Sequence, residues 1–538
     1  MSSSTASRQI SRRVVQVDNR IVHYRIAGKG PALLLIHQSP KSSAELIGMI
    51  AQLADQFTVI APDTPGYGFS DPLEEDDAGI DQFVEALVAF IEALGLSKPA
   101  IFGSHSGAIL GVRLAALYPH KISALIANGI LINDAPTRAE LVAKYFPDFL
   151  PDWSGAHLPK VWSRIRDQHC FYPWYERTAE NRIHWPATLQ AMHESAMEIL
   201  LAGEHYKTGY RAVLNYDISP DLTQLTVPAL LVVAKTDALV KYVAHYPTLS
   251  NTTEVRIVED FCDIPAATSG FAKRFIGSPT SAVLPWSPYS VSTQKRRLYE
   301  HERGTIHYRC AGEPDHPVVL LMHDLGQSSR QYSALIEGLS DSYFVIAIDL
   351  PGHGQSDEYA TEPVDVAAAL SALMTQQPVT SFAMIAIGQS CVYARLLAEG
   401  NPEQVNQWLA YLDIQALQAE NNGDLATESP PDFTPDLAGS QLVRAWYLVR
   451  DQALFSPWHV HSPQTFKTLD MSPAPTVLQQ RMLDLLISDK AARTLSRALP
   501  DSFFSDLGDD LVSQHIVDLP SNPSDLHMSL RRWLDYAF

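Results

Sequence analysis

The 538-residue sequence has few features of the specialised protein classes. Its four cysteines (Cys170, Cys262, Cys310 and Cys391) have neither metal-ligand spacing nor a paired framework, which predicts free thiols in a reducing compartment. The N-terminal residues contain no apolar core of a signal peptide, and no window is apolar over the length of a membrane span. We therefore expect a cytoplasmic protein that does not enter a membrane.

Positive charge is also scarce. The chain has 40 Lys and Arg residues against 60 Asp and Glu residues, which gives a formal net charge of −20. This balance argues against nucleic acid or an anionic membrane as a partner. The sequence contains no phosphate-binding glycine loop and no metal-ligand cluster, so we expect no metal, nucleotide or flavin cofactor. A small-molecule substrate is the expected partner.

The chain is long enough for two domains, and it repeats itself. Residues 21–28 (Ile-Val-His-Tyr-Arg-Ile-Ala-Gly) return as residues 305–312 (Thr-Ile-His-Tyr-Arg-Cys-Ala-Gly), and residues 63–71 return as residues 349–357. A third repeat lies far from both motifs, and each of its residues is separated from its match by the same number of positions. In it, residues 148–152 with Trp162, Arg166 and Trp174 match residues 432–436 with Trp446, Arg450 and Trp458.

These repeats predict a tandem duplication. We expect a first, active domain at residues 1–276 and a degenerate, non-catalytic domain at residues 297–538. Residues 277–296, rich in proline and small polar residues, are predicted to be the linker. The two halves are expected to pack against each other within the chain as a pseudo-dimer.

The fold class is predicted to be α/β, with a mostly parallel sheet in each half. Short, continuous apolar runs such as residues 32–36, 100–102 and 229–233 are typical of central strands covered by helices on both faces. An aromatic-rich stretch separates the apolar run at residues 124–127 from that at residues 229–233 and is too long for a loop. We interpret residues 135–220 as an inserted helical cap.

The most informative motif is Gly-Ser-His-Ser-Gly at residues 103–107. It follows an apolar strand and opens a helix, as a nucleophile elbow does, and its glycines permit the sharp turn. The spacing places His105 at the tip, with Ser104 and Ser106 beside it. The simpler interpretation is a histidine that fills the turn and forms local hydrogen bonds.

With strand, Asp-x-x-Gly-x-Gly-x-Ser-Asp, elbow and cap in this order, both halves resemble the α/β-hydrolase superfamily. The capped branch of haloalkane dehalogenases, epoxide hydrolases and C–C hydrolases is the most similar. The resemblance implies that the loop His37-Gln38-Ser39-Pro40 supplies a backbone amide to an oxyanion hole. Gln38 stands where that family has glycine. Two roles are open for its side chain: it orients a substrate carbonyl, or it closes the loop.

The family's acid follows a late strand, and Asp237 matches that context, while Asp134 follows the preceding strand. Either carboxylate is a candidate partner for His105, and a turn aspartate that caps a helix is the simpler interpretation. The family's catalytic histidine is missing, because no histidine occurs between His245 and His301. A Ser-His-Asp relay of the usual kind therefore cannot form.

The cap motif Arg166-Asp-Gln-His169 with Tyr172 and Trp174 is predicted to contact the ligand or to form the core of the cap. Because the second copy keeps the Arg and Trp positions, the core interpretation is favoured for them. His169 and Tyr172 differ between the copies and are better candidates for the pocket. In the second half, either Gly388 or Ser390 stands at the elbow tip.

Two classes of function follow from these residues. One is a hydrolase or C–C lyase that uses His105 as general acid or base on a small, mostly apolar carbonyl compound. The other is a non-catalytic ligand-binding or scaffold protein. An ester hydrolase that uses Ser106 is a narrower third possibility.

Overall fold

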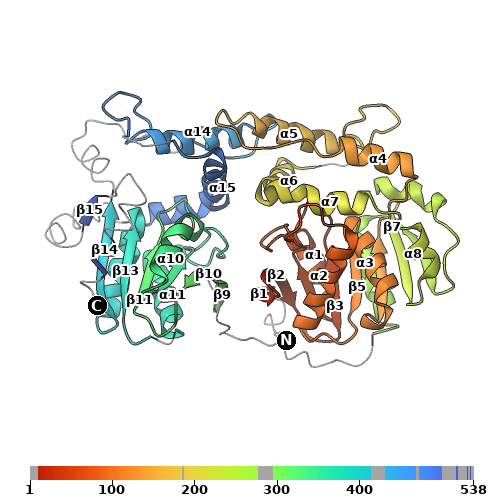
Figure 1. Ribbon diagram of the computed structural model, residues 1–538, viewed down its shortest axis with the longest axis horizontal. Helices are drawn as coiled ribbons and strands as arrows, with labels where there is room; N and C mark the ends of the chain where they lie inside the picture. Colours follow the sequence, from red (N-terminus) through yellow and green to blue (C-terminus); the bar gives the residue numbers. More distant parts are fainter. Residues whose placement is uncertain are drawn as a thin grey trace, which may run out of the picture. The chain divides into compact units, whose positions relative to one another are not determined.

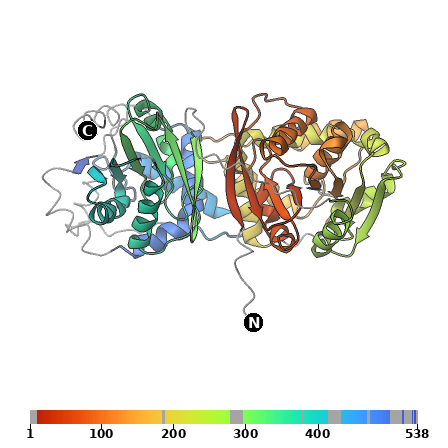
Figure 2. The ribbon, with the colours of Figure 1, turned by 90° about the horizontal axis from the view of Figure 1, so that it is seen from below.

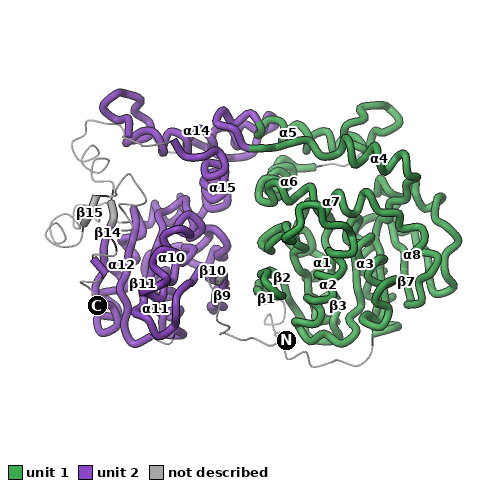
Figure 3. Tube along the Cα trace, viewed as in Figure 1, with its two compact units in different colours: residues 1–150, 157–287 green, residues 151–156, 288–538 purple. Residues whose placement is uncertain are grey.

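The computed structural model describes residues 10–183, 187–276, 295–377, 379–412, 431–467, 472–499, 516–518, 530 and 533–534. The chain divides into two compact units, residues 1–150 with 157–287 and residues 151–156 with 288–538 (Figure 3). Residues 151–156 thus belong to the second unit although they precede most of the first cap. There the carbonyl of Trp153 accepts hydrogen bonds from Trp446 Nε1 and Arg450 Nη1.

The first unit is built on an eight-stranded sheet in the order β1-β2-β4-β3-β5-β6-β7-β8. β1 pairs antiparallel with β2, β2 pairs antiparallel with β4, and the remaining pairs are parallel. The strands are β1 (Ser11–Val17), β2 (Arg20–Ala27), β3 (Ala32–Ile36), β4 (Thr58–Pro62), β5 (Ala100–Ser104), β6 (Ala124–Asn128), β7 (Ala229–Ala234) and β8 (Thr253–Val258).

Helices cover both faces of this sheet (Figures 1 and 2). Alternate residues of the central strands enter two separate cores, because successive side chains of a strand point to opposite faces. Leu34 and Ile101 join the core under α2 (Ile80–Ala93) and α3 (Ser106–Leu117). Leu33 and Phe102 join the core under α1 (Ile47–Leu53) and α9 (Ile264–Ala272). Burial on both faces explains why these strands are apolar throughout.

The described chain between β6 and β7 is helical and includes the stretch expected to form the cap. An aromatic cluster around Tyr145 and Trp174 lies within it. Its α-helices are α4 (Ala135–Lys144), α5 (His157–Gln168), α6 (Leu189–Ala202), α7 (Tyr206–Leu214) and α8 (Ser219–Gln224).

The second unit has a seven-stranded sheet in the order β15-β14-β13-β11-β12-β10-β9. As in the first unit, two antiparallel pairs at one edge adjoin a parallel remainder. The strands are β9 (Lys295–His301), β10 (Gly304–Ala311), β11 (Val318–Met322), β12 (Phe344–Ile348), β13 (Phe382–Ile387), β14 (Val405–Leu412) and β15 (Ile516–Asp518). The α-helices are α10 (Ser333–Leu339), α11 (Pro363–Thr375), α12 (Cys391–Gly400), α14 (Ser440–Leu454) and α15 (Pro475–Arg497).

A buried His–Asp pair occupies the same place in both units. His23 Nδ1 lies 2.8 Å from the Asp63 carboxylate, and His307 Nδ1 lies 2.7 Å from the Asp349 carboxylate. Each carboxylate also accepts two backbone amides from neighbouring loops. The repeated motifs at residues 21–28 and 63–71 are therefore structural, since they hold the sheet edge to the next loop.

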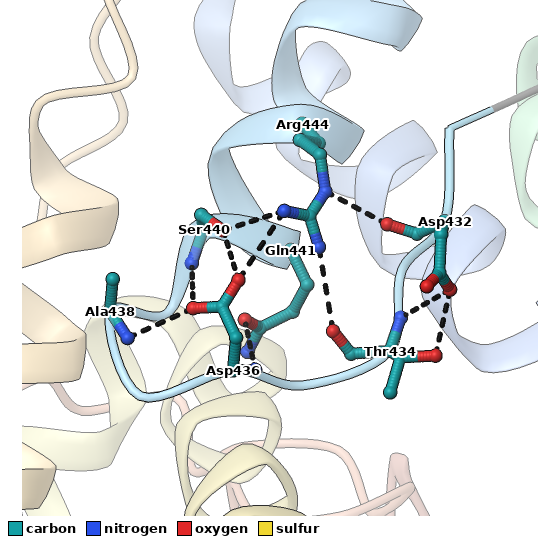
Figure 4. Close-up of polar contacts among 7 residues, drawn as sticks. All are labelled: Asp432, Thr434, Asp436, Ala438, Ser440, Gln441 and Arg444. Atoms are coloured by element: carbon teal, nitrogen blue, oxygen red, sulfur yellow. Dashed lines mark hydrogen bonds and ion pairs between the residues drawn. The ribbon is translucent and has the colours of Figure 1, made fainter.

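The third repeated motif begins a cap helix. In the second unit, the carboxylate of Asp436 accepts the backbone amides of Ala438 and Ser440 before α14 begins, and Arg444 donates to it from the first turn (Figure 4). Hydrogen bonding from Ser440 lowers the pKa of Asp436 to about 2. In the first copy, Asp152 accepts the backbone amide of Ser154 shortly before α5.

Several predicted boundaries need adjustment. The last helix of the first unit, α9, starts at Ile264 and not near Phe271, because Asp260 and Pro265 favour a helix start there. Strand β9 begins at Lys295, so the last two residues of the predicted linker belong to a strand. Residues 277–294 lie outside the described residues. Within the described part of the chain, no helix is long and apolar enough to cross a membrane.

Candidate active site

The elbow of the first unit places His105 between β5 and α3. His105 has φ 46° and ψ −106°, a strained conformation for a residue with a side chain. A Cβ at Gly103 would lie 2.2 Å from the Gly107 carbonyl oxygen, and one at Gly107 would lie 2.4 Å from the Ile36 carbonyl oxygen. Both glycines are thus required by backbone contact, and their spacing fixes His105 as the tip.

The imidazole of His105 binds two side chains. Its Nε2 lies 2.8 Å from Asp237 Oδ2, and its Nδ1 lies 2.7 Å from Gln38 Oε1. Asp237 follows β7 and its other oxygen accepts the Leu239 amide at 2.8 Å, so the carboxylate is held at the start of a 3-10 helix. The side chain of His105 is 18% exposed and that of Asp237 is fully buried.

Glu45 decides which end of the Gln38 amide faces His105. Its carboxylate accepts Gln38 Nε2 at 2.9 Å and the Gln38 backbone amide at 2.7 Å. Because a carboxylate only accepts, Nε2 must face Glu45, and Oε1 is left to face His105. Both ring nitrogens of His105 therefore donate, one to an amide oxygen and one to a carboxylate. The arrangement holds His105 as an imidazolium cation.

The electrostatics agree with this hydrogen-bond pattern. Burial alone lowers the pKa of His105, but the charge and hydrogen bond of Asp237, with a further contribution from Glu45, outweigh it and raise the net pKa. Burial raises the pKa of Asp237, and His105 with the Leu239 amide reverses this, so its net pKa lies below the ordinary value. Each partner stabilises the charged form of the other.

The second candidate acid, Asp134, lies elsewhere. It is exposed and caps α4, where its carboxylate accepts the Thr137 amide at 2.9 Å. The two acids were equivalent in the sequence because both follow a parallel strand. In the structure, Asp237 is the carboxylate bonded to His105.

The serines beside the tip have separate partners. The hydroxyl of Ser106 is buried and accepts the backbone amide of Ser39 at 2.5 Å. The Ser39 amide belongs to the loop to which the resemblance assigns an oxyanion-hole amide, and Ser106 engages it. Ser104 Oγ accepts a long hydrogen bond of 3.4 Å from Asn128 Nδ2. His37 is buried and shapes the loop, with Nδ1 on the Gln38 carbonyl and Nε2 accepting the Thr64 amide.

The four cap candidates occupy different surroundings. Arg166 is exposed on α5, so the core interpretation favoured from the sequence is wrong for this residue. Its neighbour Asp167 pairs with Arg177 at 2.7 Å. Trp174 donates to the Tyr145 carbonyl within the aromatic cluster. The remaining two are half-buried. His169 has a lowered pKa from burial and from the charge of Lys41, and Tyr172 has a strongly raised pKa from burial, neighbouring tyrosines and Asp237. Of the four candidates, Tyr172 is the one whose pKa is raised in part by the charge of Asp237.

A carboxyl group from the cap, absent from the sequence predictions, also contacts the loop after Gln38. Glu198 of α6 accepts the Ser42 hydroxyl at 2.8 Å, and burial raises its pKa to about 7. The second unit repeats the contact between Ser328 and Asp484 at 2.7 Å. Because both units keep this link, it ties cap to loop and is not specific to the site of His105.

The elbow of the second unit carries no side chain at its tip. Gly388 has φ 63°, as the tip requires, whereas Ser390 is buried and donates to the Ile387 carbonyl. The carboxylate of Asp324 fills the space above Gly388, where a Cβ would lie 2.1 Å from Asp324 Cγ. Oδ1 of Asp324 accepts the amides of Leu325 and Gln389, both at 2.8 Å.

That pair of amides corresponds to the oxyanion donors of an elbow, one from the loop and one from the residue after the tip. The second unit thus places its own carboxylate where a ligand oxyanion would bind. Burial raises the pKa of Asp324 to about 6 although the two amides oppose the shift.

Three residues of these sites were not singled out from the sequence: Glu45, Glu198 and Asp324. Glu45 gave no signal of its own, and only the replacement of glycine by Gln38 pointed to an altered loop. Asp324 follows His323 as Gln38 follows His37, so alignment of the two copies locates it. In the described residues, no three His, Cys, Asp or Glu side chains are grouped to hold a metal ion.

Fold and elbow together define a protein of the α/β-hydrolase class. The sequence profile of the alpha/beta hydrolase fold matches residues 31–261 and 317–409, which is more than half of the chain, and one match falls in each unit. The chain belongs to the α/β hydrolase fold family. The similarity to the capped members expected from the sequence is also found among individual relatives.

An uncharacterized hydrolase of Saccharomyces cerevisiae is 35% identical over 117 residues, which are 21% of this chain and 40% of that protein. A haloalkane dehalogenase of Mycolicibacterium paratuberculosis is 36% identical over 115 residues, 20% of this chain and 38% of that protein. A 2-(acetamidomethylene)succinate hydrolase of Mesorhizobium japonicum is 29% identical over 127 residues, 24% of this chain and 45% of that protein. The chain matches less than half the length of each.

Among solved structures, an E-2-(acetamidomethylene)succinate hydrolase is 19% identical with a TM-score of 0.38, over 49% of this chain and 100% of that chain. An epoxide hydrolase of Vigna radiata is 20% identical with a TM-score of 0.39, over 51% of this chain and 100% of that chain.

Proposed function

We propose that the first unit is an enzyme that hydrolyses, or cleaves a C–C bond of, a small and mostly apolar carbonyl compound, with His105 as general acid and base. The observation that carries the proposal is the position of His105 at the elbow tip, partly exposed, between Asp237 and Gln38. Relatives named as a haloalkane dehalogenase and as a succinate-derivative hydrolase support a reaction of the hydrolase type.

Nδ1 is the nitrogen that transfers the proton. A substrate oxygen that displaces Oε1 of Gln38 accepts the Nδ1 proton and leaves a neutral ring. Nε2 keeps its proton on Asp237, so the ring stays oriented with the lone pair of Nδ1 toward the substrate. The same lone pair then removes a proton from water or from the reaction intermediate.

A non-catalytic binding function is the second candidate. Two observations support this alternative. Both ring nitrogens of His105 are already bonded, and the Ser39 amide is engaged by Ser106. The third candidate, an ester hydrolase with Ser106 as nucleophile, is disfavoured because that hydroxyl is buried and held by a backbone amide. A serine-directed fluorophosphonate is expected to leave Ser106 unlabelled.

The second unit is proposed to be non-catalytic. Gly388 offers no reactive group, and Asp324 occupies the amides that would receive an oxyanion. Its proposed contribution is to stabilise the first half by packing within the chain. Asp324→Asn keeps the shape of the side chain and is expected to leave turnover by the first unit unchanged.

The test compares His105→Gln with the wild type on aryl esters, epoxides, haloalkanes and β-diketones. Loss of a positioned acid–base group lowers kcat by about 10²- to 10⁴-fold. His120→Gln, at an exposed position outside the site, is the control and keeps full activity. Turnover that survives in His105→Gln contradicts the acid–base role. Compounds that bind the wild type but are never converted favour the binding function.

A further inference from the structure

Among the described residues, no carboxylate pairs with one buried cation in the cap of the first unit. Arg164 lies on α5 and is 2% exposed. The guanidinium carbon lies 5.4 Å from the ring centre of Tyr145 and 5.6 Å from that of Trp174. Its Nη1 donates to Gln168 Oε1 at 2.7 Å. The aromatic rings cover the guanidinium, and one of its ends is bonded.

The other edge of this guanidinium, formed by Nε and Nη2, is unpaired among the described residues. Neither Nε nor Nη2 of Arg164 has a hydrogen-bond partner in the described part of the chain, although both atoms are buried. A buried cation whose donors are left unpaired is costly, and proteins rarely keep one without an anion. The unpaired edge therefore indicates a ligand.

The chemistry of that edge is illustrated elsewhere in the same unit. Arg113 binds the carboxylate of Asp81 through Nε at 2.8 Å and Nη2 at 3.1 Å. These two parallel donors match the two oxygens of a carboxylate, which is the most specific pairing a guanidinium makes. Arg164 presents the same two donors, but no side chain of the described residues fills the place that Asp81 takes.

The second unit offers an internal comparison. Arg164 lies between the repeated residues Trp162 and Arg166, and the matching position between Trp446 and Arg450 is Leu448. Leu448 is as buried as Arg164. The cap helix can therefore pack with an apolar side chain at this position and does not need an arginine there. The unit that keeps a side chain at its elbow tip is the one that carries the buried arginine.

Aromatic rings surround the guanidinium of Arg164. Tyr145 and Trp174 cover it, and the rings of Tyr175 and Tyr210 pack against Tyr145 with centres 6.3 and 5.3 Å from its own. Surroundings of this kind suit the apolar body of a ligand whose anionic end binds Arg164.

We propose that Arg164 binds the carboxylate of a small, otherwise apolar ligand through Nε and Nη2. The inference deepens the function proposed above, and rests on it only in taking this ligand to be the substrate of His105. The substrate class is then a carbonyl compound with a free carboxylate at the end remote from the cleaved bond.

The test measures binding and needs no turnover. Benzoate, phenylacetate and hexanoate are titrated calorimetrically into the full-length protein, each beside its neutral primary amide. The wild type is expected to bind at least one acid tenfold or more tightly than its amide. Arg164→Leu, which installs the residue of the second unit, removes that preference. Lys160→Leu, which removes an exposed cation from the same helix, keeps it.

Equal binding of acids and amides by the wild type overturns the proposal, and so does a preference that survives in Arg164→Leu. If Arg164→Leu does not fold, Arg164→Lys keeps the charge but loses the two-donor edge, and it must bind the acid more weakly than the wild type. His105→Gln separates the two proposals, because it is expected to lose turnover and to keep the acid preference. If the wild type shows the acid preference but converts none of the compounds tested, Arg164 remains a binding residue and only the enzymatic function is contradicted.

Discussion

The carboxylate of Glu45 fixes the Gln38 side chain by accepting both its backbone amide and Nε2, at 2.7 and 2.9 Å. Through this contact Glu45 adds to the effect of Asp237 on the protonation of His105, although no described hydrogen bond joins Glu45 to the ring. The charge of Glu45 favours the imidazolium, and the amide orientation places an acceptor at Nδ1. Glu45 is therefore a positioning residue.

Replacing Glu45 by Gln is expected to lower the pKa of His105, as loss of a nearby opposite charge does. The orientation of Gln38 also lowers the His105 pKa in this variant, because an amide at position 45 no longer forces Oε1 of Gln38 toward the ring. The measurement is a pH titration of the histidine ring nitrogens by NMR, with His105→Gln to assign the signal. Glu85→Gln, exposed on α2, is the control. An unchanged His105 pKa in Glu45→Gln contradicts the role.

The His105–Asp237 pair makes stability depend on pH. The pKa of His105 is raised above its ordinary value of 6.5, so its stabilisation is complete below that value and is lost as pH rises through the folded-state pKa. The pKa of Asp237 is lowered from 3.8, so its contribution is present above 3.8 and is lost as pH falls. The pair contributes most between these two values.

Asp237→Asn keeps the bond to Leu239 but removes the charge. Its free energy of unfolding is expected to be about 3 kcal/mol below that of the wild type between pH 4 and 6.5, near the lower end for breaking a buried ion pair. Urea unfolding at several pH values checks this. The difference must shrink above the His105 pKa, and a constant difference across pH would show that the pair is not ionic.

Asp324 has the opposite linkage. Burial raises its pKa from 3.8 to about 6, so the folded state favours the protonated form. The wild type is therefore penalised as pH rises from 3.8 to 6 and carries the full penalty above that range. Asp324→Asn can still accept both amides at Oδ1, and it is expected to raise stability at pH 7.5 by roughly 2–3 kcal/mol with no gain near pH 4. Thermal unfolding at both pH values tests this, and a variant less stable at pH 7.5 would contradict it.

Gly103→Ala is expected to prevent folding of the first unit, because the new Cβ would lie 2.2 Å from a backbone oxygen that cannot move independently. Gly48→Ala is the matched control. Its Cβ meets nothing within 4 Å on α1, and alanine stabilises a helix by up to about 1 kcal/mol relative to glycine. Circular dichroism and soluble yield distinguish the two variants. A folded Gly103→Ala protein would show that the elbow tolerates a wider turn.

The elbow and the strands around it were predictable because their signals are local. Glycine spacing determines the tip at His105, and buried runs such as β3 are apolar regardless of distant contacts. The choice between Asp237 and Asp134 was not predictable, because both follow strands that end at the same sheet edge. Only the fold shows that both carboxylates cap a helix and that Asp237 also bonds the ring of His105.

Contacts that depend on side-chain orientation were also hidden. The Gln38 amide takes its direction from Glu45, and nothing in the spacing of these two residues indicates it. Arg164 occupies an ordinary position on an amphipathic helix, and only its burial without a carboxylate marks it. Comparison of the two copies is the sequence signal that separates it from Leu448.

The carboxylate above Gly388 also couples the elbow tip of the second unit to its two amides. A side chain introduced at position 388 would meet Asp324, since even a Cβ there lies 2.1 Å from the carboxyl carbon. To admit it, the Asp324 side chain would have to turn away from the Leu325 and Gln389 amides. A single substitution at the tip would therefore also uncover both donors.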